Sequence, residues 1–141
     1  MSCLLMIYRE EKLKANSIEP KNILVVEDEP GIARVCLRVL NSEGFEVEIE
    51  ANGKTAWETL GQKEYDLYII DIRTPGMNGI ELYRNMLKGF PELADRVLFT
   101  TGDTMSSNIK DFLEHTRRPY LAKPFTPDDL RNAVNAIFKN D

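Results

Sequence analysis

Five side chains that could do chemistry stand at the ends of short apolar runs in this sequence. They are Glu27, Asp28, Asp71, Thr101 and Lys123. Apolar runs of this length are typical of buried strands. The carboxyl ends of parallel strands meet at one edge of a sheet, where α/β proteins bind their ligands. We therefore expect three carboxylates, one hydroxyl and one ammonium group to lie close together.

The three carboxylates predict a metal site. Glu27, Asp28 and Asp71 would repel one another by roughly 4 kcal/mol per pair at about 4 Å and an effective dielectric constant of about 20, before screening. A divalent cation offsets this repulsion. Mg²⁺ is the expected ion, because it prefers oxygen ligands and commonly takes carboxylates together with waters and a phosphate oxygen. Mn²⁺ is the expected substitute.

The same group of side chains indicates one reaction in particular. A carboxylate flanked by Mg²⁺, a lysine and a threonine is equipped for in-line attack on a phosphoryl donor, which gives an acyl phosphate. Asp71 is then the nucleophile. The metal and Lys123 offset charge on the transferring phosphoryl oxygens, and Thr101 could donate a hydrogen bond to one of them.

The elements that position these residues follow the rhythm of a parallel sheet with crossover helices, because short apolar runs alternate with longer amphipathic stretches after Pro20. Five strands are expected, at about 23–27, 45–50, 66–70, 96–100 and 120–122. Five helices are expected. The first follows Pro30 and runs to about Leu40, the second follows Asn52-Gly53 and includes 56–60, and the third includes 80–87. The last two are expected at about 106–115 and 126–139. Thr126 is expected to cap the last helix.

The patterns of two strands predict their places in the sheet. Apolar residues alternate with glutamates over 45–50, which gives that strand one polar face and indicates an edge position. The strand at 66–70 is almost wholly apolar, as expected for a strand covered by helices on both faces, so we place it at the centre.

Composition excludes several classes of function. The net charge of −5 and the single basic doublet, Arg117-Arg118, argue against a nucleic-acid-binding surface on this chain. No apolar run approaches the ~20 residues that span a bilayer. The two cysteines, Cys3 and Cys36, lack the spacing of a metal site and fit free thiols in a reducing compartment. We expect a cytoplasmic protein that contacts neither membrane nor nucleic acid.

Two regions are expected along the chain. Residues 1–20 form an N-terminal extension, either a tail or a short helix, in which an apolar stretch precedes a charged one. A loosely ordered extension and a docking or dimerisation segment both remain open for it. Residues 21–141 form the single domain that carries the site.

Four segments resemble the receiver domain of the two-component response-regulator family. They are ILVVEDE at 23–29, DIRTPGMNG at 71–79, FTTGD at 99–103 and YLAKPF at 120–125. They stand in the order and spacing of that family, and the resemblance covers about residues 21–140. It implies a flavodoxin-like, doubly wound (βα)5 fold with a five-stranded parallel sheet in the order 2-1-3-4-5.

The resemblance also implies roles for the residues at the strand ends. It makes Asp71 the phosphoacceptor, and Glu27 and Asp28 the acidic metal pair. Thr101 becomes the switch hydroxyl and Lys123 the invariant lysine.

Two further residues are assigned roles only by the resemblance. Tyr120 matches the switch aromatic residue, and the backbone carbonyl of Arg73 would complete the metal shell. A sensor histidine kinase or a histidine phosphotransfer protein would donate the phosphoryl group, after which Thr101 and Tyr120 move inward. That movement would involve the loop at 101–107. It would change the surface formed by the helix at 106–115, the strand at 120–122 and the last helix.

Two positions depart from what the family often carries. Arg73 is a long cation beside the acceptor, and we predict that it alters the lifetime of the phosphoryl group. Gly102 replaces a common alanine, which would leave room near the phosphate and ease exchange with small donors.

The residues present argue against two rival functions. An unphosphorylated docking module would usually have lost the acceptor, the metal ligands or the lysine, and all of them are present. A phosphohydrolase with an aspartyl-phosphate intermediate would need a second aspartate at the position of Arg73. No nucleotide-binding glycine motif occurs. We therefore expect no enzyme activity beyond self-phosphorylation and dephosphorylation.

The downstream partner stays open. A stand-alone relay, a receiver excised from a hybrid kinase or longer regulator, and a homodimer formed on phosphorylation are all compatible with the sequence.

Overall fold

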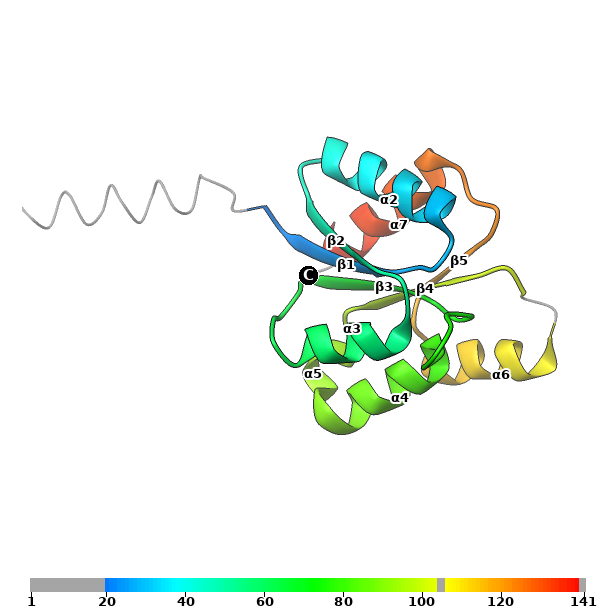
Figure 1. Ribbon diagram of the computed structural model, residues 1–141. Coiled ribbons are helices and arrows are strands. Elements are labelled where there is room, and N and C mark those ends of the chain that lie inside the picture. The colour runs from blue at the N-terminus through cyan, green and yellow to red at the C-terminus, as the bar shows by residue number, and fades with distance from the viewer. Residues whose placement is uncertain (1–19, 104–105, 140–141) are drawn as a thin grey trace, which may run out of the picture.

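A parallel sheet of five strands lies at the centre of the computed structural model, which describes residues 20–103 and 106–139 (Figure 1). The strands are β1 (Asn22–Val26), β2 (Glu46–Glu50), β3 (Leu67–Asp71), β4 (Val97–Thr101) and β5 (Tyr120–Ala122). Their order is β2-β1-β3-β4-β5, and every neighbouring pair is parallel. The predicted order, the edge position of β2 and the central position of β3 are confirmed.

Helices cover both faces of the sheet. They are α2 (Pro30–Ser42), α3 (Gly53–Leu60), α4 (Gly79–Gly89), α5 (Pro91–Ala94), α6 (Ser107–Thr116) and α7 (Pro127–Lys139). Figure 1 shows α2 and α7 on one face and the other four on the opposite face. Within the described residues this makes a three-layer α/β fold of the flavodoxin type, as expected.

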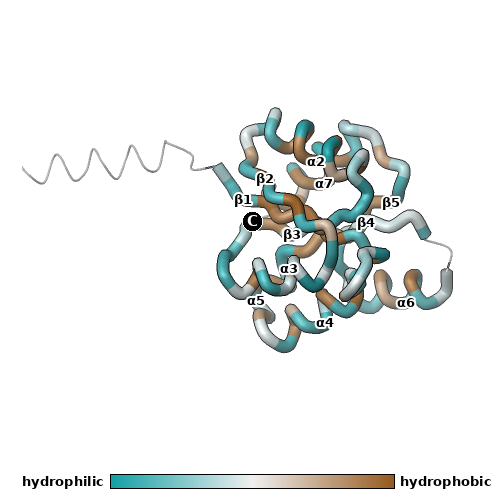
Figure 2. The backbone as a smooth tube through the Cα atoms, viewed as in Figure 1, coloured by the Kyte–Doolittle hydropathy of each residue, from teal (hydrophilic) through white to brown (hydrophobic). Residues whose placement is uncertain are grey.

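The alternation of side chains along each strand produces two hydrophobic layers. Ile23 and Val25 of β1 belong to the layer under α2 and α7, together with Leu40. Leu24 and Val26 point to the other face and join the larger layer under the remaining helices. Figure 2 shows hydrophobic colour concentrated along the sheet and on the inner sides of the helices.

Several predicted boundaries were wrong by one or two residues. β3 begins at Leu67 and includes Asp71, because Asp71 pairs with Thr100 of β4 in the ladder. β1 ends at Val26 and β4 extends to Thr101. The first helix continues to Ser42, beyond the expected end at Leu40.

The short helix α5 was not predicted. Gly89 and Pro91 break the helical pattern in the sequence, and Pro91 begins a new helical turn, since proline is well suited to the first position of a helix.

Side-chain caps start three helices where the chain must turn sharply. Asn52 accepts a hydrogen bond from the Thr55 amide at the start of α3, and Asn78 does the same for Glu81 in α4. The predicted cap at Thr126 is confirmed: its hydroxyl accepts from the Asp129 amide at 3.1 Å, and the Asp129 carboxylate accepts from the Thr126 amide at 2.9 Å.

The expected extension at 1–20 lies outside the described residues, except for Pro20. Within the described part of the chain, no helix has both the length and the apolar character needed to cross a bilayer.

Glu48 on the outer strand β2 makes stability depend on pH. Lys63 Nζ lies 2.7 Å from its Oε1, and the Tyr65 hydroxyl donates to its Oε2. These hydrogen bonds, Lys63 first, lower the pKa of Glu48. The stability they give is fully present above the unfolded glutamate pKa of about 4.3, and it is lost as the pH falls through the lower folded value.

We expect Glu48→Gln to lower the urea midpoint at pH 7 and to make much less difference at about pH 3. Glu58→Gln, at an exposed position on α3, serves as the control. A difference between wild type and Glu48→Gln that stays constant between the two pH values would contradict the interpretation.

Candidate functional site

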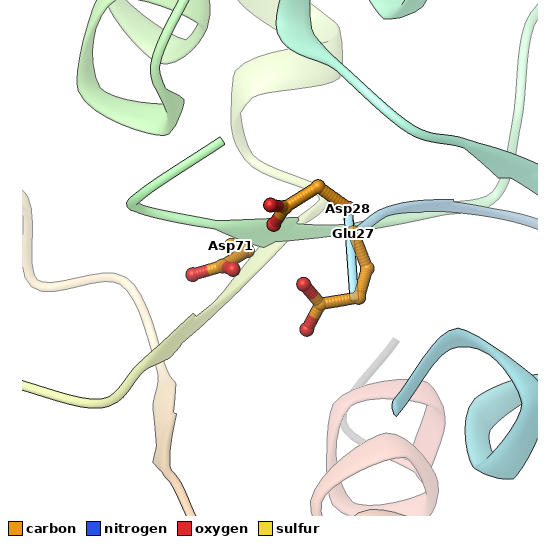
Figure 3. A group of neighbouring side chains, drawn as sticks. All are labelled: Glu27, Asp28 and Asp71. Carbon is orange, nitrogen blue, oxygen red and sulfur yellow. The ribbon is translucent and has the colours of Figure 1, made fainter. Parts of the chain in front are cut away.

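Three carboxylates from two neighbouring strands meet at the carboxyl edge of the sheet. Glu27 and Asp28 follow β1, and Asp71 ends β3 (Figure 3). One oxygen from each lies within 4.8 Å of one from each of the others. Glu27 is 3% exposed and Asp71 4% exposed, whereas Asp28 is exposed to solvent. The structure therefore brings together the carboxylates that the sequence placed at this edge.

Lys123 reaches into the same group from the end of β5. Its Nζ lies 2.6 Å from Glu27 Oε1 and 2.9 Å from Asp71 Oδ2. The lysine side chain is 12% exposed, so this contact is largely shielded from solvent. Burial acts to lower the pKa of Lys123, but the bonds and charges of Glu27 and Asp71 outweigh it and raise that pKa. The lysine remains a cation at neutral pH.

Glu27 is the carboxylate most affected by burial. Burial raises the pKa of Glu27 to about 7, Lys123 opposes that shift, and the neighbouring Asp71 adds to it. Its Oε1 is buried and accepts no hydrogen bond of good geometry, although Lys123 Nζ lies close to it. Three carboxylates whose oxygens lie within 4.8 Å of one another, two of them buried, are a donor set that fits Mg²⁺ or Mn²⁺.

Both oxygens of Asp71 are engaged. Oδ2 accepts from Lys123, and Oδ1 accepts from the backbone amide of Arg73 at 3.2 Å. The loop after β3 therefore turns back on Asp71 and places the main chain of Arg73 beside the acceptor oxygen.

Thr101 and Tyr120 lie apart from this group of contacts. Thr101 is fully buried, and its hydroxyl donates to the backbone carbonyl of Asp103 and accepts from the Asp103 amide, both at 3.0 Å. Tyr120 is 51% exposed and lines a shallow surface pocket with Lys110 and Leu113. In this structure the predicted switch residue Thr101 is therefore hydrogen-bonded to the backbone of Asp103, and the predicted switch residue Tyr120 is half-exposed at the surface.

Asp103 is a residue of the site region that the sequence analysis missed. Its Oδ2 lies 2.6 Å from Arg73 Nη2, and its Oδ1 accepts from the Ser106 amide at 2.9 Å. A usable signal was present: opposite charges stand two residues beyond Asp71 and two residues beyond Thr101, at the ends of adjacent strands.

The loop that carries Arg73 packs tightly against the start of α3. The Gly53 amide donates to the Pro75 carbonyl at 3.3 Å, and a Cβ built on Gly53 would lie 1.7 Å from the carbonyl oxygen of Met77. At Gly79, which begins α4 where this loop ends, an added Cβ would lie 2.5 Å from the Asp71 carbonyl oxygen. Glycine is therefore required at positions 53 and 79 to let the backbones approach.

Comparison with known proteins gives a consistent result. Residues 23–135 match the family model described as the response regulator receiver domain. Sporulation initiation phosphotransferase F of Bacillus subtilis is 34% identical over 114 residues, which cover 81% of this chain and 90% of that protein.

Two further comparisons are with a longer protein and with a solved structure. Response regulator ArlR of Staphylococcus epidermidis is 30% identical over 118 residues, which are 84% of this chain and 52% of that protein. The chain thus spans about half the length of ArlR. The receiver domain of a sensor histidine kinase from Pseudomonas aeruginosa, solved with a magnesium ion coordinated in its active site cleft, is 26% identical with a TM-score of 0.75. That match covers 86% of this chain and 99% of the solved one.

Proposed function

This chain belongs to the response regulator receiver family of two-component signal transduction, and from that premise we propose that it is phosphorylated on Asp71. One observation carries the proposal: Asp71 lies beside two further carboxylates and is held by Lys123 at 2.9 Å. That arrangement supplies a nucleophile, metal ligands and a fixed cation at a single point.

In the proposed reaction, an oxygen of Asp71 forms a bond to phosphorus. The bond from phosphorus to the donor atom breaks at the same time, and the electron pair leaves with that atom. The donor atom is a ring nitrogen of a phosphohistidine or an oxygen of a small acyl phosphate. Lys123, already against Asp71, offsets negative charge on the phosphoryl oxygens as the new bond forms.

The proposed metal ligands are Glu27, Asp28, Asp71 and the backbone carbonyl of Arg73. Mg²⁺ or Mn²⁺ bound there supplies positive charge to the phosphoryl oxygens. The crowding of the three carboxylates, whose oxygens lie within 4.8 Å of one another, supports this assignment.

The proposed switch uses Thr101 and Tyr120. For the Thr101 hydroxyl to donate to a phosphoryl oxygen, the hydrogen bond that it donates to the Asp103 carbonyl must break. The loop from 101 to the start of α6 would move with it, and the half-exposed Tyr120 would turn inward. The surface formed by α6, β5 and α7 would change as a result, which is how partners would distinguish the two states.

Receiver domains are generally regulatory, and we propose a regulatory role here, with no turnover beyond self-phosphorylation and dephosphorylation. Histidine kinases and phosphotransfer proteins interact with such domains, and one of them is the proposed donor. Residues 21–141 form the proposed receiver domain, and a homodimer of the phosphorylated form is a proposed output state.

The test is the intact mass of wild type and Asp71→Ala after incubation with acetyl phosphate, with and without Mg²⁺. We expect a gain of about 80 Da, one phosphoryl group, that needs both Asp71 and Mg²⁺. Asp111→Asn, which removes an exposed carboxylate on α6, is the matched control and should gain the same mass as wild type. No gain by wild type under conditions that modify another receiver would favour a docking module instead.

A further inference from the structure

An ion pair joins the two loops that flank the phosphorylation site. Arg73 lies two residues beyond Asp71 at the end of β3, and Asp103 lies two residues beyond Thr101 at the end of β4. Their side chains meet at 2.6 Å. We propose that Asp103 is a positioning residue that withholds the Arg73 guanidinium from an incoming phosphoryl group, so that this pair restrains phosphorylation. The inference rests on the proposed function.

Asp103 is the anchored member of the pair. Its Oδ1 accepts from the Ser106 amide just before α6, and its backbone exchanges two hydrogen bonds with the Thr101 hydroxyl. Its side chain is 28% exposed, against 66% for that of Arg73. Arg73 therefore has room to change partner, while Asp103 stays tied to β4 and to the start of α6.

Arg73 starts close to where a phosphoryl group would arrive. Its backbone amide already donates to Asp71 Oδ1, so its side chain begins beside the acceptor. A phosphoryl group carries about −1.5 to −2 charges against −1 for a carboxylate, and a guanidinium binds phosphate oxygens through two parallel hydrogen bonds. Once Asp71 is phosphorylated, the phosphoryl group competes with Asp103 for this guanidinium.

Asp103 holds both groups that would meet the phosphoryl group. Its carboxylate holds Arg73, and its backbone holds the Thr101 hydroxyl. Breaking the Arg73–Asp103 contact and breaking the Thr101–Asp103 contact would therefore both release the segment that joins β4 to α6. This connects the charge of the modified site to the start of α6.

The test is the rate at which acetyl phosphate and Mg²⁺ modify four proteins: wild type, Asp103→Asn, Arg73→Ala and the double variant. Asparagine keeps an oxygen for the Ser106 amide and replaces the charged oxygen that contacts Arg73 with a neutral amide group. We expect Asp103→Asn to be modified about two- to five-fold faster than wild type, the range that one exposed ion pair allows. In the Arg73→Ala background, the same change at Asp103 is expected to have no effect.

A matched ion pair at the opposite end of the same strands supplies the control. Arg96 Nη1 lies 2.9 Å from Glu64 Oε1, where β3 and β4 begin. Glu64→Gln should leave the rate unchanged. High salt should reduce the difference between Asp103→Asn and wild type, because screening weakens an exposed pair.

Each other outcome overturns the inference. An equal acceleration by Asp103→Asn with and without Arg73 would show that the carboxylate acts without the guanidinium, and slower or unchanged modification would show that it restrains nothing. If wild type gains no phosphoryl group, the proposed function fails as well. If wild type is modified and the variants act independently, only this inference fails.

Discussion

Lys123→Met is expected to destabilise the metal-free protein by about 3 kcal/mol and to slow phosphorylation of Asp71 by at least about 100-fold. Methionine keeps the unbranched shape of lysine with one atom fewer, and it removes the charge that lies 2.6 Å from Glu27 and 2.9 Å from Asp71. Both carboxylates are buried, so solvent cannot replace the lysine. The cost stays at the low end for a broken buried pair because Glu27, with its pKa raised to about 7, can take up a proton.

Urea unfolding in the presence of a chelator measures the loss of stability, and added Mg²⁺ is expected to restore part of it by binding the same carboxylates. Lys63→Met is the matched control. Lys63 pairs with Glu48 at 2.7 Å, but its side chain is 45% exposed, so we expect a change below about 1 kcal/mol. Equal losses in the two variants would refute the assignment of Lys123 as the cation of a buried site.

Gly53→Ala is expected to weaken Mg²⁺ binding and phosphorylation by about tenfold or more, with a loss of stability of about 1–3 kcal/mol. The added methyl group would lie 1.7 Å from the carbonyl oxygen of Met77, so the loop at 72–78 must move. That loop carries the Arg73 amide that donates to Asp71 and the Arg73 carbonyl proposed as a metal ligand. Gly53 therefore acts on the site through the loop.

Mg²⁺ titration, acetyl phosphate kinetics and urea unfolding separate these effects. Gly61→Ala, at the other end of α3, is the control, because its nearest neighbour is an ordinary contact at 3.5 Å and its backbone is right-handed helical. We expect Gly61→Ala to keep wild-type metal affinity. If Gly53→Ala loses stability while its Mg²⁺ affinity and its rate at saturating Mg²⁺ match wild type, then the contact is structural and does not position the site.

The meeting of Glu27, Asp28 and Asp71 could be predicted because these residues follow or end buried strands. A strand covered on both faces is apolar along its whole length, so its end is visible in sequence, and parallel strands must deliver those ends to one edge. Asp71 and Lys123 are 52 residues apart, yet they meet for this reason. The order of strands came from the family resemblance, since periodicity alone does not say which strands are neighbours.

Three features were harder to predict because tertiary contacts determine them: the Arg73–Asp103 pair, the need for glycine at position 53, and the ends of the strands. The Arg73–Asp103 pair joins two exposed loops and leaves no periodic pattern, so its one signal was the matching position of the two charges beyond adjacent strand ends. The requirement for glycine at position 53 arises from the backbone of Met77, which comes from another loop. Strand ends were misplaced by a residue because pairing with the neighbouring strand sets them, as Thr100 does for Asp71.

The two edges of the sheet also bear on how copies of this chain can associate. β2 alternates glutamates with apolar residues, and β5 contains only three residues. Charged side chains and short length both discourage a second chain from adding a strand at an open edge. Fibril-like stacking through the sheet is thereby disfavoured even at high protein concentration. Orderly self-association of this domain is then expected through surfaces other than strand addition, such as that of α6, β5 and α7, where a phosphorylation-dependent change can control it.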